Sequence, residues 1–290
     1  MKTIAIIPNL PFGDTVGVTE KIIEMFSEEE VRLILPDATK KYLKQSENVE
    51  FASYEELMEA CDIVIAVGGD GTVTAYASDA AKHNKPILGI NAGHLGFLSG
   101  LEKTEISALS SLLKGEYKIK QRMMLRATVY DDKGKVLSSE YCVNDAFIGR
   151  AHHSRMVDLR VELDNKLLSD YRADGVIIAT PTGSTAYSMS AGGPVVDPLI
   201  ECMIVTPVCS HSLTARSVVC SSESTVVIRN HSSINDVRQI ALITDSKAAI
   251  EIPYGGKVEI KKAEIPVSFI SIKKQSFYEV LKEKMIERNH

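Results

Sequence analysis

The chain has 290 residues, of which 44% are hydrophobic and 24% charged, and its formal net charge is −5 at pH 7. A chain of this length can bury one large or two medium hydrophobic cores. Its negative charge argues against nucleic acid as a general partner. No apolar run approaches the ~20 residues of a membrane-spanning helix, so we expect no membrane partner either.

The first residues of the chain and its cysteines indicate in which cellular compartment we expect the protein. The apolar run that ends at Pro8 is too short for a secretory signal and is predicted to form the first strand. The five cysteines are odd in number and contain no CxxC pair, which favours reduced thiols over disulfides or a zinc site. We therefore expect a cytoplasmic protein.

Strands and helices are predicted to alternate over the first 120 residues. This alternation is typical of a parallel sheet with helices on its faces. The predicted strands cover residues 3–7, 31–35, 63–67 and 86–90, and the predicted helices cover about 15–29, 54–60, 71–83 and 104–114. The pattern predicts an α/β nucleotide-binding domain over residues 1–120.

After Tyr117, longer alternating runs replace this pattern, with hairpin-turn sequences at 132–134 and 164–165. The predicted strands cover 125–130, 136–148, 157–163, 176–179, 226–228, 239–244 and 257–261. They predict a largely β, sandwich-like domain over residues 121–267.

The tail, residues 268–290, returns to a helical pattern. Its apolar residues are spaced to form one buried face, and they are Phe277, Val280, Leu281 and Met285. We expect this C-terminal helix to pack back on the first domain.

Residues 64–72, VIAVGGDGT, run from an apolar strand into three glycines that enclose one carboxylate. Open α/β sheets bind ligands at the carboxyl ends of their strands. Gly68, Gly69 and Gly71 allow positive φ and let backbone amides approach an anion, and the next helix adds donors. Asp70 repels phosphate, so its presence indicates Mg²⁺ or a sugar hydroxyl to be deprotonated. The alternative is an ordinary turn in which Asp70 caps the helix.

A second predicted strand ends at Ala179 in a turn rich in hydroxyl groups, TPTGSTAYSMSAGGP over residues 180–194. Tyr187 can cover a planar ring. Neutral donors and acceptors suit a polyhydroxyl or amide-bearing ligand better than a bare anion, and here they are Thr182, Ser184, Thr185 and Ser190. On composition alone, a Ser/Thr-rich connecting loop explains the segment equally well.

Six segments carry the functional information when they are taken together. They are GGDGT at 68–72, GHLGFL at 93–98, Asn144-Asp145, Asp174-Gly175, TPTGSTAY at 180–187 and TPVCSHSL at 206–213. In this order, and over nearly the whole chain, they resemble the NAD kinase family. GGDGT is shared with diacylglycerol-type lipid kinases and is similar to the phosphofructokinase loop, whereas TPTGSTAYSMSAGGP is far more specific.

The resemblance implies phosphorylation of the 2′-hydroxyl of the adenosine ribose of NAD, giving NADP. The implied donor is ATP or inorganic polyphosphate, with a divalent metal, expected to be Mg²⁺. By analogy, Asp70 orients this hydroxyl and accepts its proton, and phosphate binds at Gly68, Gly69, Gly71 and Thr72. Phosphoryl transfer has a loose transition state, so positioning and charge neutralisation matter most and a modest base is enough.

The resemblance also assigns an NAD site. Asn144 and Asp145 match an Asn-acid pair that binds the adenosine, although Glu is usual where this chain has Asp145. Asp174 matches the acid at the nicotinamide end, and Arg172 is expected to pair with it or with the pyrophosphate. The other expected NAD contacts are Gly71, Phe97, Thr182, Thr185, Ala186, Tyr187 and Ser190.

Several of these residues also have a plain structural explanation. Without the family, a strand-end turn explains Asn144-Asp145, solvation explains Arg172, and core packing explains Phe97. Asp245 matches the family's third acid, which is usually followed by glycine. Ser246 departs from that pattern, and because serine disfavours positive φ, the turn has a different shape or carries strain.

Two other functions stay open from the sequence. A lipid or sugar kinase shares GGDGT but does not explain residues 174–194. The second alternative function is that of a dinucleotide-binding sensor that has lost catalysis, and the intact Asp70 argues against this alternative. By resemblance, we expect NAD in the crevice between the domains and a homodimer or homotetramer formed through the β-rich domain.

Overall fold

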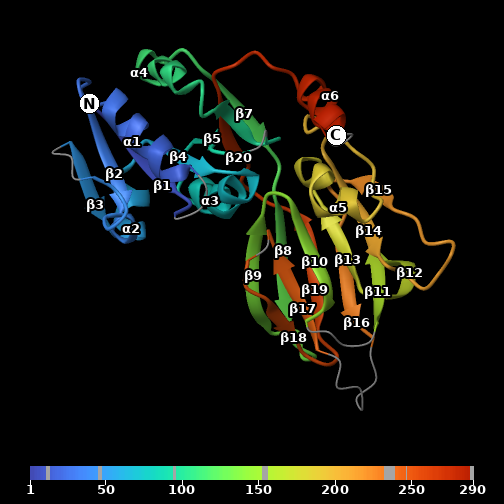
Figure 1. Cartoon of the computed structure of the whole chain (residues 1–290). Coiled ribbons are helices and arrows are strands. Elements are labelled where there is room, and N and C mark those ends of the chain that lie inside the picture. Colours follow the sequence, from blue (N-terminus) through green and yellow to red (C-terminus); the bar gives the residue numbers. More distant parts are fainter. Residues whose placement is uncertain are drawn as a thin grey trace. The chain divides into compact units, whose positions relative to one another are not determined.

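The computed structural model describes residues 1–10, 14–44, 48–93, 96–151, 156–231, 239–245 and 247–287, with side chains described up to Lys284. His94 and Leu95 of the GHLGFL segment, Ser246 and the side chain of Met285 lie outside these ranges. The chain forms two compact units, Met1–Gln121 with Val267–His290, and Arg122–Pro266. Figure 1 shows the elements of each.

The first unit contains a sheet in the order β3-β2-β1-β4-β5-β20-β7, with β6 also paired to β5. The described pairings among β1 to β6, and of β20 with β5, are parallel. The strands are β1 (Lys2–Pro8), β2 (Val31–Pro36), β3 (Val49–Ala52), β4 (Ile63–Gly68), β5 (Ile87–Asn91), β6 (Ser99–Glu102), β7 (Lys118–Arg122) and β20 (Val267–Ser271). The central strands β4 and β5 are buried throughout, as expected for strands covered on both faces.

Helices accompany this sheet (Figure 1), so the predicted α/β domain with a parallel sheet is confirmed. They are α1 (Thr15–Met25), α2 (Tyr54–Ala60), α3 (Asp70–Lys82), α4 (Ser110–Lys114) and α6 (Phe277–Glu287), with 3₁₀ turns at Asp37–Thr39 and Ile106–Leu109. Helix α6 packs within this unit, also as predicted. Strand β20, just before it, has no counterpart in the sequence prediction. Within the described ranges, every helix is too short or too polar to cross a membrane.

The second unit is an antiparallel β-sandwich, as predicted. One sheet has the order β15-β14-β13-β10-β17-β18 and the other β12-β11-β16-β19-β8-β9. The strands are β8 (Leu125–Tyr130), β9 (Val136–Cys142), β10 (Asp145–Arg150), β11 (Val157–Leu163), β12 (Lys166–Ala173), β13 (Gly175–Ala179), β14 (Cys202–Val208), β15 (Val218–Ser221), β16 (Val226–Asn230), β17 (Ile240–Thr244), β18 (Ile250–Ile252) and β19 (Lys257–Lys262). A 3₁₀ turn (Thr182–Thr185) and α5 (Tyr187–Ser190) follow β13.

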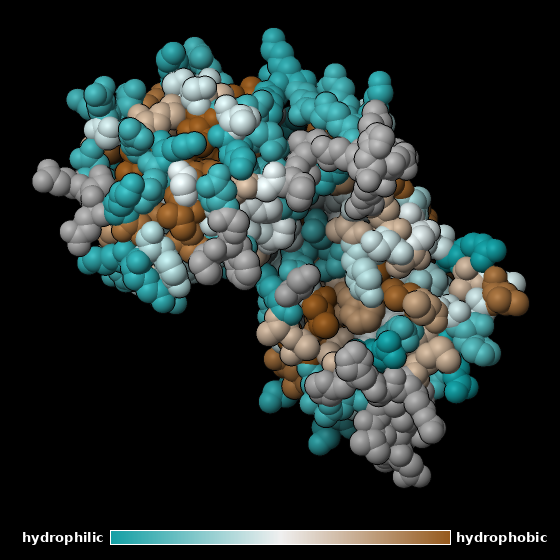
Figure 2. Space-filling model, in the orientation of Figure 1, coloured by the Kyte–Doolittle hydropathy of each residue, from teal (hydrophilic) through white to brown (hydrophobic). Residues whose placement is uncertain are grey.

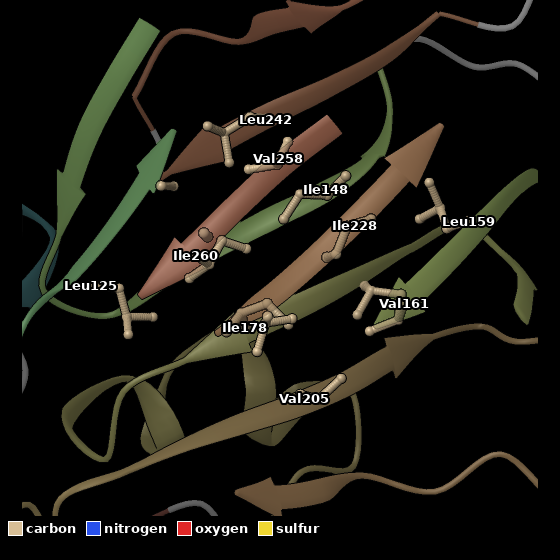
Figure 3. Packing of buried hydrophobic residues seen from close by; sticks show 14 of the residues in the cluster. Leu125, Ile148, Leu159, Val161, Ile178, Val205, Ile228, Leu242, Val258 and Ile260 are labelled. Atoms are coloured by element: carbon tan, nitrogen blue, oxygen red, sulfur yellow. The ribbon is translucent and has the colours of Figure 1, made fainter. Parts of the chain in front are cut away.

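The sandwich core lies between these two sheets (Figure 3). Alternate residues of each strand point inward, which is the period-two pattern that the sequence shows. Ile148, Ile178, Val205 and Leu242 come from the first sheet, and Leu125, Leu159, Val161, Ile228, Val258 and Ile260 come from the second. The opposite face of the first sheet buries a smaller cluster that includes Ile177, Ala179 and Ile204.

The predicted strand 136–148 is wrong as one element, because the structure divides it. Strand β9 pairs with β8 in one sheet, whereas β10 pairs with β13 and β17 in the other. The break falls at Val143 and Asn144, whose amides bond to the carboxylate of Asp245. A partner about 100 residues away therefore ends the strand.

Two glycines let an aromatic ring lie flat on the first sheet. Gly149 and Gly175 face each other across β10 and β13. A Cβ at Gly175 would stand 2.3 Å from Phe147 Cε2 and 2.7 Å from the carbonyl oxygen of Ile148. The ring of Phe147 therefore occupies the place of the missing side chains, and its centroid lies 5.7 Å from that of Tyr187.

We predict that Gly175→Ala destabilises the second unit by about 1–3 kcal/mol, because an added methyl group must displace Phe147 in a packed region. The measurement is the urea unfolding midpoint followed by circular dichroism. Gly71→Ala is the control, since no atom lies within 4 Å of its Cβ position. An unchanged midpoint for Gly175→Ala would contradict the packing described.

Candidate functional site

The GGDGT loop joins β4 to α3 at the carboxyl end of the parallel sheet. Strand β4 ends at Gly68, Gly69 is the N-cap, and Asp70 is the first residue of α3. The amides of Asp70 and Gly71 come before the first full turn of the helix, so they have no carbonyl of a preceding turn to bond. Two backbone donors and the positive end of the helix dipole thus meet here.

The carboxylate of Asp70 is held by a turn that follows β5. Its Oδ2 accepts the amide of Phe97 at 2.6 Å, and its Oδ1 accepts the amide of Leu98 at 3.0 Å. Gly96 makes this approach possible, because a Cβ there would overlap Asp70 Oδ1 at 2.1 Å. The predicted alternative, in which Asp70 caps α3, is wrong, since the helix has no side-chain cap.

Of the two purposes predicted for the loop glycines, positive φ is wrong, whereas open access to the backbone amides agrees with the structure at Gly69 and Gly71. Among the described glycines, positive φ occurs at Gly115, Gly134, Gly192 and Gly255, and not in GGDGT. A Cβ at Gly68 would meet Thr72 Oγ1 at 2.3 Å, so Gly68 is required by close packing. The Cβ positions of Gly69 and Gly71 have no atom within 4 Å. These two glycines therefore leave the amides open to a ligand, which suits an anion.

Acidic and amide groups lie beside this loop. Asn91, fully buried at the end of β5, donates from Nδ2 to Glu102 Oε2 at 2.8 Å. Burial raises the pKa of Glu102, the Asn91 hydrogen bond and the charge of Lys273 lower it, and the negative charges of Glu105 and Asp70 raise it. The described residues hold no group of three or more His, Cys, Asp or Glu side chains arranged for a metal ion.

In the second unit, Asp245 organises the Asn144-Asp145 turn. Its Oδ2 accepts the amide of Val143 at 2.7 Å, and its Oδ1 accepts those of Asn144 at 2.8 Å and Asp145 at 3.2 Å. Asp245 itself has a φ of +48°. Aspartate tolerates this region better than most residues, so the geometry is strained but accessible. Asp245 acts on the backbone of the turn, a contact that the sequence did not predict.

Asp145 and Asp245 form a buried pair of like charges. Burial and then the carboxylate of Asp245 raise the pKa of Asp145 to about 7. Burial also raises the pKa of Asp245, to about 6, although three amide hydrogen bonds lower it. Because Asp245 has these donors, Asp145 is the member that keeps its proton to higher pH.

The hydroxyl-rich segment packs against the same turn. Thr180 donates from its amide to the carbonyl of Asn144 at 2.9 Å and from Oγ1 to that of Val143 at 2.6 Å. Gly183 lies so close that a Cβ would meet the Asn144 carbonyl oxygen at 2.0 Å. Thr182 is buried, Thr185 and Ala186 are half-buried, and Tyr187 and Ser190 are exposed. The predicted NAD residues of this segment are therefore brought together with Asn144 and Asp145.

Tyr187 connects this group to Asp174. Burial raises the pKa of Tyr187, and the nearby negative groups of Cys209, Asp174 and Asp145 raise it further, whereas Arg150 lowers it. These side chains therefore share one region of the second unit.

The expected ion pair of Arg172 with Asp174 is wrong. Asp174 pairs with Arg150, whose Nη2 lies 3.0 Å from Oδ2. Arg172 is exposed on β12, opposite Asp158. Sequence reasoning missed Arg150, and although Thr180 and Gly96 lie in the segments that it singled out, it gave neither residue a role.

Proteins with a known family assignment match the chain over nearly its full length. The NAD kinase of Desulforamulus reducens is 36% identical over 288 residues, which are 99% of this chain and 98% of the relative. The chain belongs to the NAD kinase family. The family models match in two parts, the ATP-NAD kinase N-terminal domain over residues 15–117 and the ATP-NAD kinase C-terminal domain over residues 143–272. The NAD kinase of Caldanaerobacter subterraneus subsp. tengcongensis is 35% identical over 289 residues, covering 99% of this chain and 100% of the relative.

Solved structures share the fold. A crystal structure of yeast NADH kinase complexed with NADH superposes with a TM-score of 0.87 at 23% identity, covering 98% of this chain and 87% of that one. The structure of an NAD kinase from Archaeoglobus fulgidus in complex with ATP has a TM-score of 0.71 at 24% identity, covering 97% of this chain and 98% of that one. At these identities the likeness establishes the NAD kinase fold.

The raised pKa of Asp145 predicts how stability depends on pH. The unfolded chain loses this proton near pH 4, whereas the folded chain keeps it until about pH 7. Between these values the folded state binds more protons, so the free energy of unfolding falls as the pH rises. Asn has no such proton to lose, so Asp145→Asn removes this fall in the free energy of unfolding. We expect the variant to have a free energy of unfolding at pH 7 that is higher by one to a few kcal/mol, since one pKa unit is about 1.4 kcal/mol.

The measurement is urea unfolding of both proteins at pH 4 and pH 7. The gain from Asp145→Asn is expected at pH 7 and absent at pH 4. A variant that is equally stabilised at both pH values, or destabilised at pH 7, would show that the carboxyl group of Asp145 is not held protonated in the folded state.

Proposed function

We propose that this protein transfers a phosphoryl group from ATP to the 2′-hydroxyl of the adenosine ribose of NAD, forming NADP and ADP. Family membership supports the reaction. The observation that carries it is the carboxylate of Asp70, fixed by two amides at the open N-terminus of α3. Inorganic polyphosphate is the second donor to test.

In this proposal, Asp70 orients the 2′-hydroxyl and accepts its proton. The ribose oxygen forms a bond to the γ-phosphorus while the bond to the β-γ bridging oxygen breaks and leaves with ADP. Each carboxylate oxygen of Asp70 accepts one amide, so each keeps capacity for a hydroxyl donor. A proton acceptor of this kind contributes roughly 10²–10⁴-fold to the rate.

The phosphate side of the proposal uses backbone groups. The amides of Asp70 and Gly71 point from the start of α3, and Gly69 and Gly71 leave the approach open. Gly68 and Thr72 pack against each other and hold the loop in this shape. These four positions, with Gly71 also next to the ribose, form the proposed phosphate site.

A divalent metal, which we infer to be Mg²⁺, fits this arrangement only with phosphate ligands. Mg²⁺ usually keeps its waters and binds one or two carboxylates together with substrate phosphates. The described residues offer Asp70 and Glu102 here, without a third acidic group in ligand geometry. When bound, the metal neutralises charge on the transferring phosphoryl group.

The NAD side of the proposal lies in the second unit. Asn144 and Asp145 bind the adenosine, and Asp174, paired with Arg150, meets the nicotinamide end. Asp245 acts through the turn that it holds. The other proposed contacts in the second unit are Arg172, Thr182, Thr185, Ala186, Tyr187 and Ser190, and Phe97 of the first unit is a further proposed contact.

We also infer a homo-oligomer and a cytoplasmic location. The second unit has large apolar side chains that are more than half exposed, namely Leu167, Leu199, Ile200, Leu213 and Val219. Apolar surface is visible in Figure 2. Such residues are typical of surfaces that a second subunit covers. All five cysteines are free thiols, and Cys209 is exposed, which favours a reducing compartment.

We predict that Asp70→Asn lowers the turnover number by at least 10²-fold and changes the affinity for NAD by no more than a few-fold. The amide cannot accept the proton, and its NH2 group cannot accept one of the two backbone amides that the carboxylate binds. The measurements are NADP formation from NAD, ATP and Mg²⁺, and titration calorimetry with NAD. Asp79→Asn, on the same helix but paired with Lys82, is the control for charge loss.

Wild-type protein that binds NAD yet makes no NADP with ATP or polyphosphate would favour the sensor that has lost catalysis. Protein that ignores NAD and phosphorylates a lipid would contradict the proposed function. Full activity of Asp70→Asn would contradict the role of Asp70 as proton acceptor but would not contradict NADP formation.

A further inference from the structure

The C-terminal segment of the first unit is attached to the rest of the unit at two points, and a local hydrogen-bond pair then begins its helix. Strand β20 joins the parallel sheet beside β5 through Phe269, opposite Ile87. Lys273 then forms an ion pair with Glu105. Finally, Ser276 and Glu279 bond reciprocally and fix the first turn of α6, with Glu279 Oε2 accepting the Ser276 amide at 2.7 Å and Ser276 Oγ accepting the Glu279 amide at 3.3 Å.

Helix α6, positioned in this way, contacts the ring of Phe97. The ring centroids of Phe277 and Phe97 lie 6.2 Å apart with an interplanar angle of 39°. One face of the same helix also places Lys284 Nζ 4.4 Å from the centroid of the Phe97 ring, a cation–π contact. Both residues are half-buried and lie seven positions apart, which is two turns on one helix face.

The residue that α6 holds is the residue that holds Asp70. The amide of Phe97 donates to Asp70 Oδ2, and the next amide, of Leu98, donates to Oδ1. Gly96 precedes them and contributes no side chain contact of its own, so the ring of Phe97 is the part of this turn that α6 reaches. A movement of the ring would therefore shift both donors of the carboxylate.

We propose that α6 is a positioning element for the reacting carboxylate, with Phe277 and Lys284 as positioning residues that act through Phe97. This inference rests on the proposed function, because it gives α6 a role only if Asp70 is the proton acceptor. It also separates two roles of Phe97: contact with NAD sets affinity, whereas its contacts with α6 set the geometry of Asp70 and hence the turnover number.

The first test is Phe277→Ala in the full-length chain. We expect the turnover number to fall by about 10-fold, since an aromatic contact is worth about one power of ten when it acts on the transition state alone. The KM for NAD should change by a smaller factor than the turnover number, because the backbone of Phe97, and not only its ring, positions Asp70. Phe277→Tyr, which keeps the ring, should restore the turnover number.

Lys284→Met provides a milder variant with a matched control. We expect a loss of about 2- to 5-fold in turnover number, because partly exposed cation–π contacts are weak. Lys282→Met removes an exposed lysine from the same helix and should leave turnover unchanged. This pair decides the question if Phe277→Ala does not fold.

Hydrogen exchange measured by NMR tests directly whether α6 stabilises the hydrogen bonds from the Phe97 and Leu98 amides to Asp70. The amides of Phe97 and Leu98 should exchange at least about 10-fold faster in Phe277→Ala than in wild type, while amides of β4 remain protected. An unchanged turnover number and unchanged exchange at these two amides would overturn the inference. So would equal losses in Lys284→Met and Lys282→Met. Failure of wild-type protein to form NADP would instead contradict the proposed function.

Discussion

The hydrogen bonds from consecutive backbone amides to a single carboxylate are the interaction on which the candidate functional residues of each unit depend. Asp70 accepts the amides of Phe97 and Leu98, and Asp245 accepts those of Val143, Asn144 and Asp145. Charge-assisted bonds of this kind are stronger than neutral ones and fix direction as well as distance. Each carboxylate thereby defines the shape of a turn that is distant in sequence. The candidate chemistry follows from that shape, since an acid with a fixed orientation can meet a hydroxyl in one geometry.

In the second unit, the same arrangement brings two carboxyl groups into a buried region, which disfavours their charged forms. Asp145 and Asp245 lie together in a buried place, and burial raises the pKa of both. A core built for stability alone would not place two carboxyl groups there. Their presence beside Asn144, Thr182 and Tyr187 fits a site that exchanges hydrogen bonds with ribose hydroxyls, because a carboxyl group near its pKa can both donate and accept.

The sequence predicted the elements whose pattern is local. The run from Ile63 to Gly68 and the alternation within the sandwich strands depend on burial of neighbouring residues, and the structure confirms both. The break at Val143 depends on an aspartate about 100 residues later, and the ion pair of Asp174 depends on Arg150 across the sheet, so no local pattern shows them. The glycines illustrate the same limit. Their positions pointed to the loop, but only three-dimensional packing shows that Gly68 makes room for Thr72 and that Gly69 and Gly71 leave the amides open.

The central claim is that the carboxylate held by the turn at Phe97 receives the proton of the NAD 2′-hydroxyl. A crystal structure of this protein with NAD, Mg²⁺ and a non-hydrolysable ATP analogue tests it most directly. The account predicts that the 2′-oxygen of the adenosine ribose lies about 2.6–3.2 Å from a carboxylate oxygen of Asp70, with the amides of Phe97 and Leu98 still bonded to that carboxylate. A 2′-hydroxyl that faces a different group, with Asp70 bonded only to backbone amides, would contradict it.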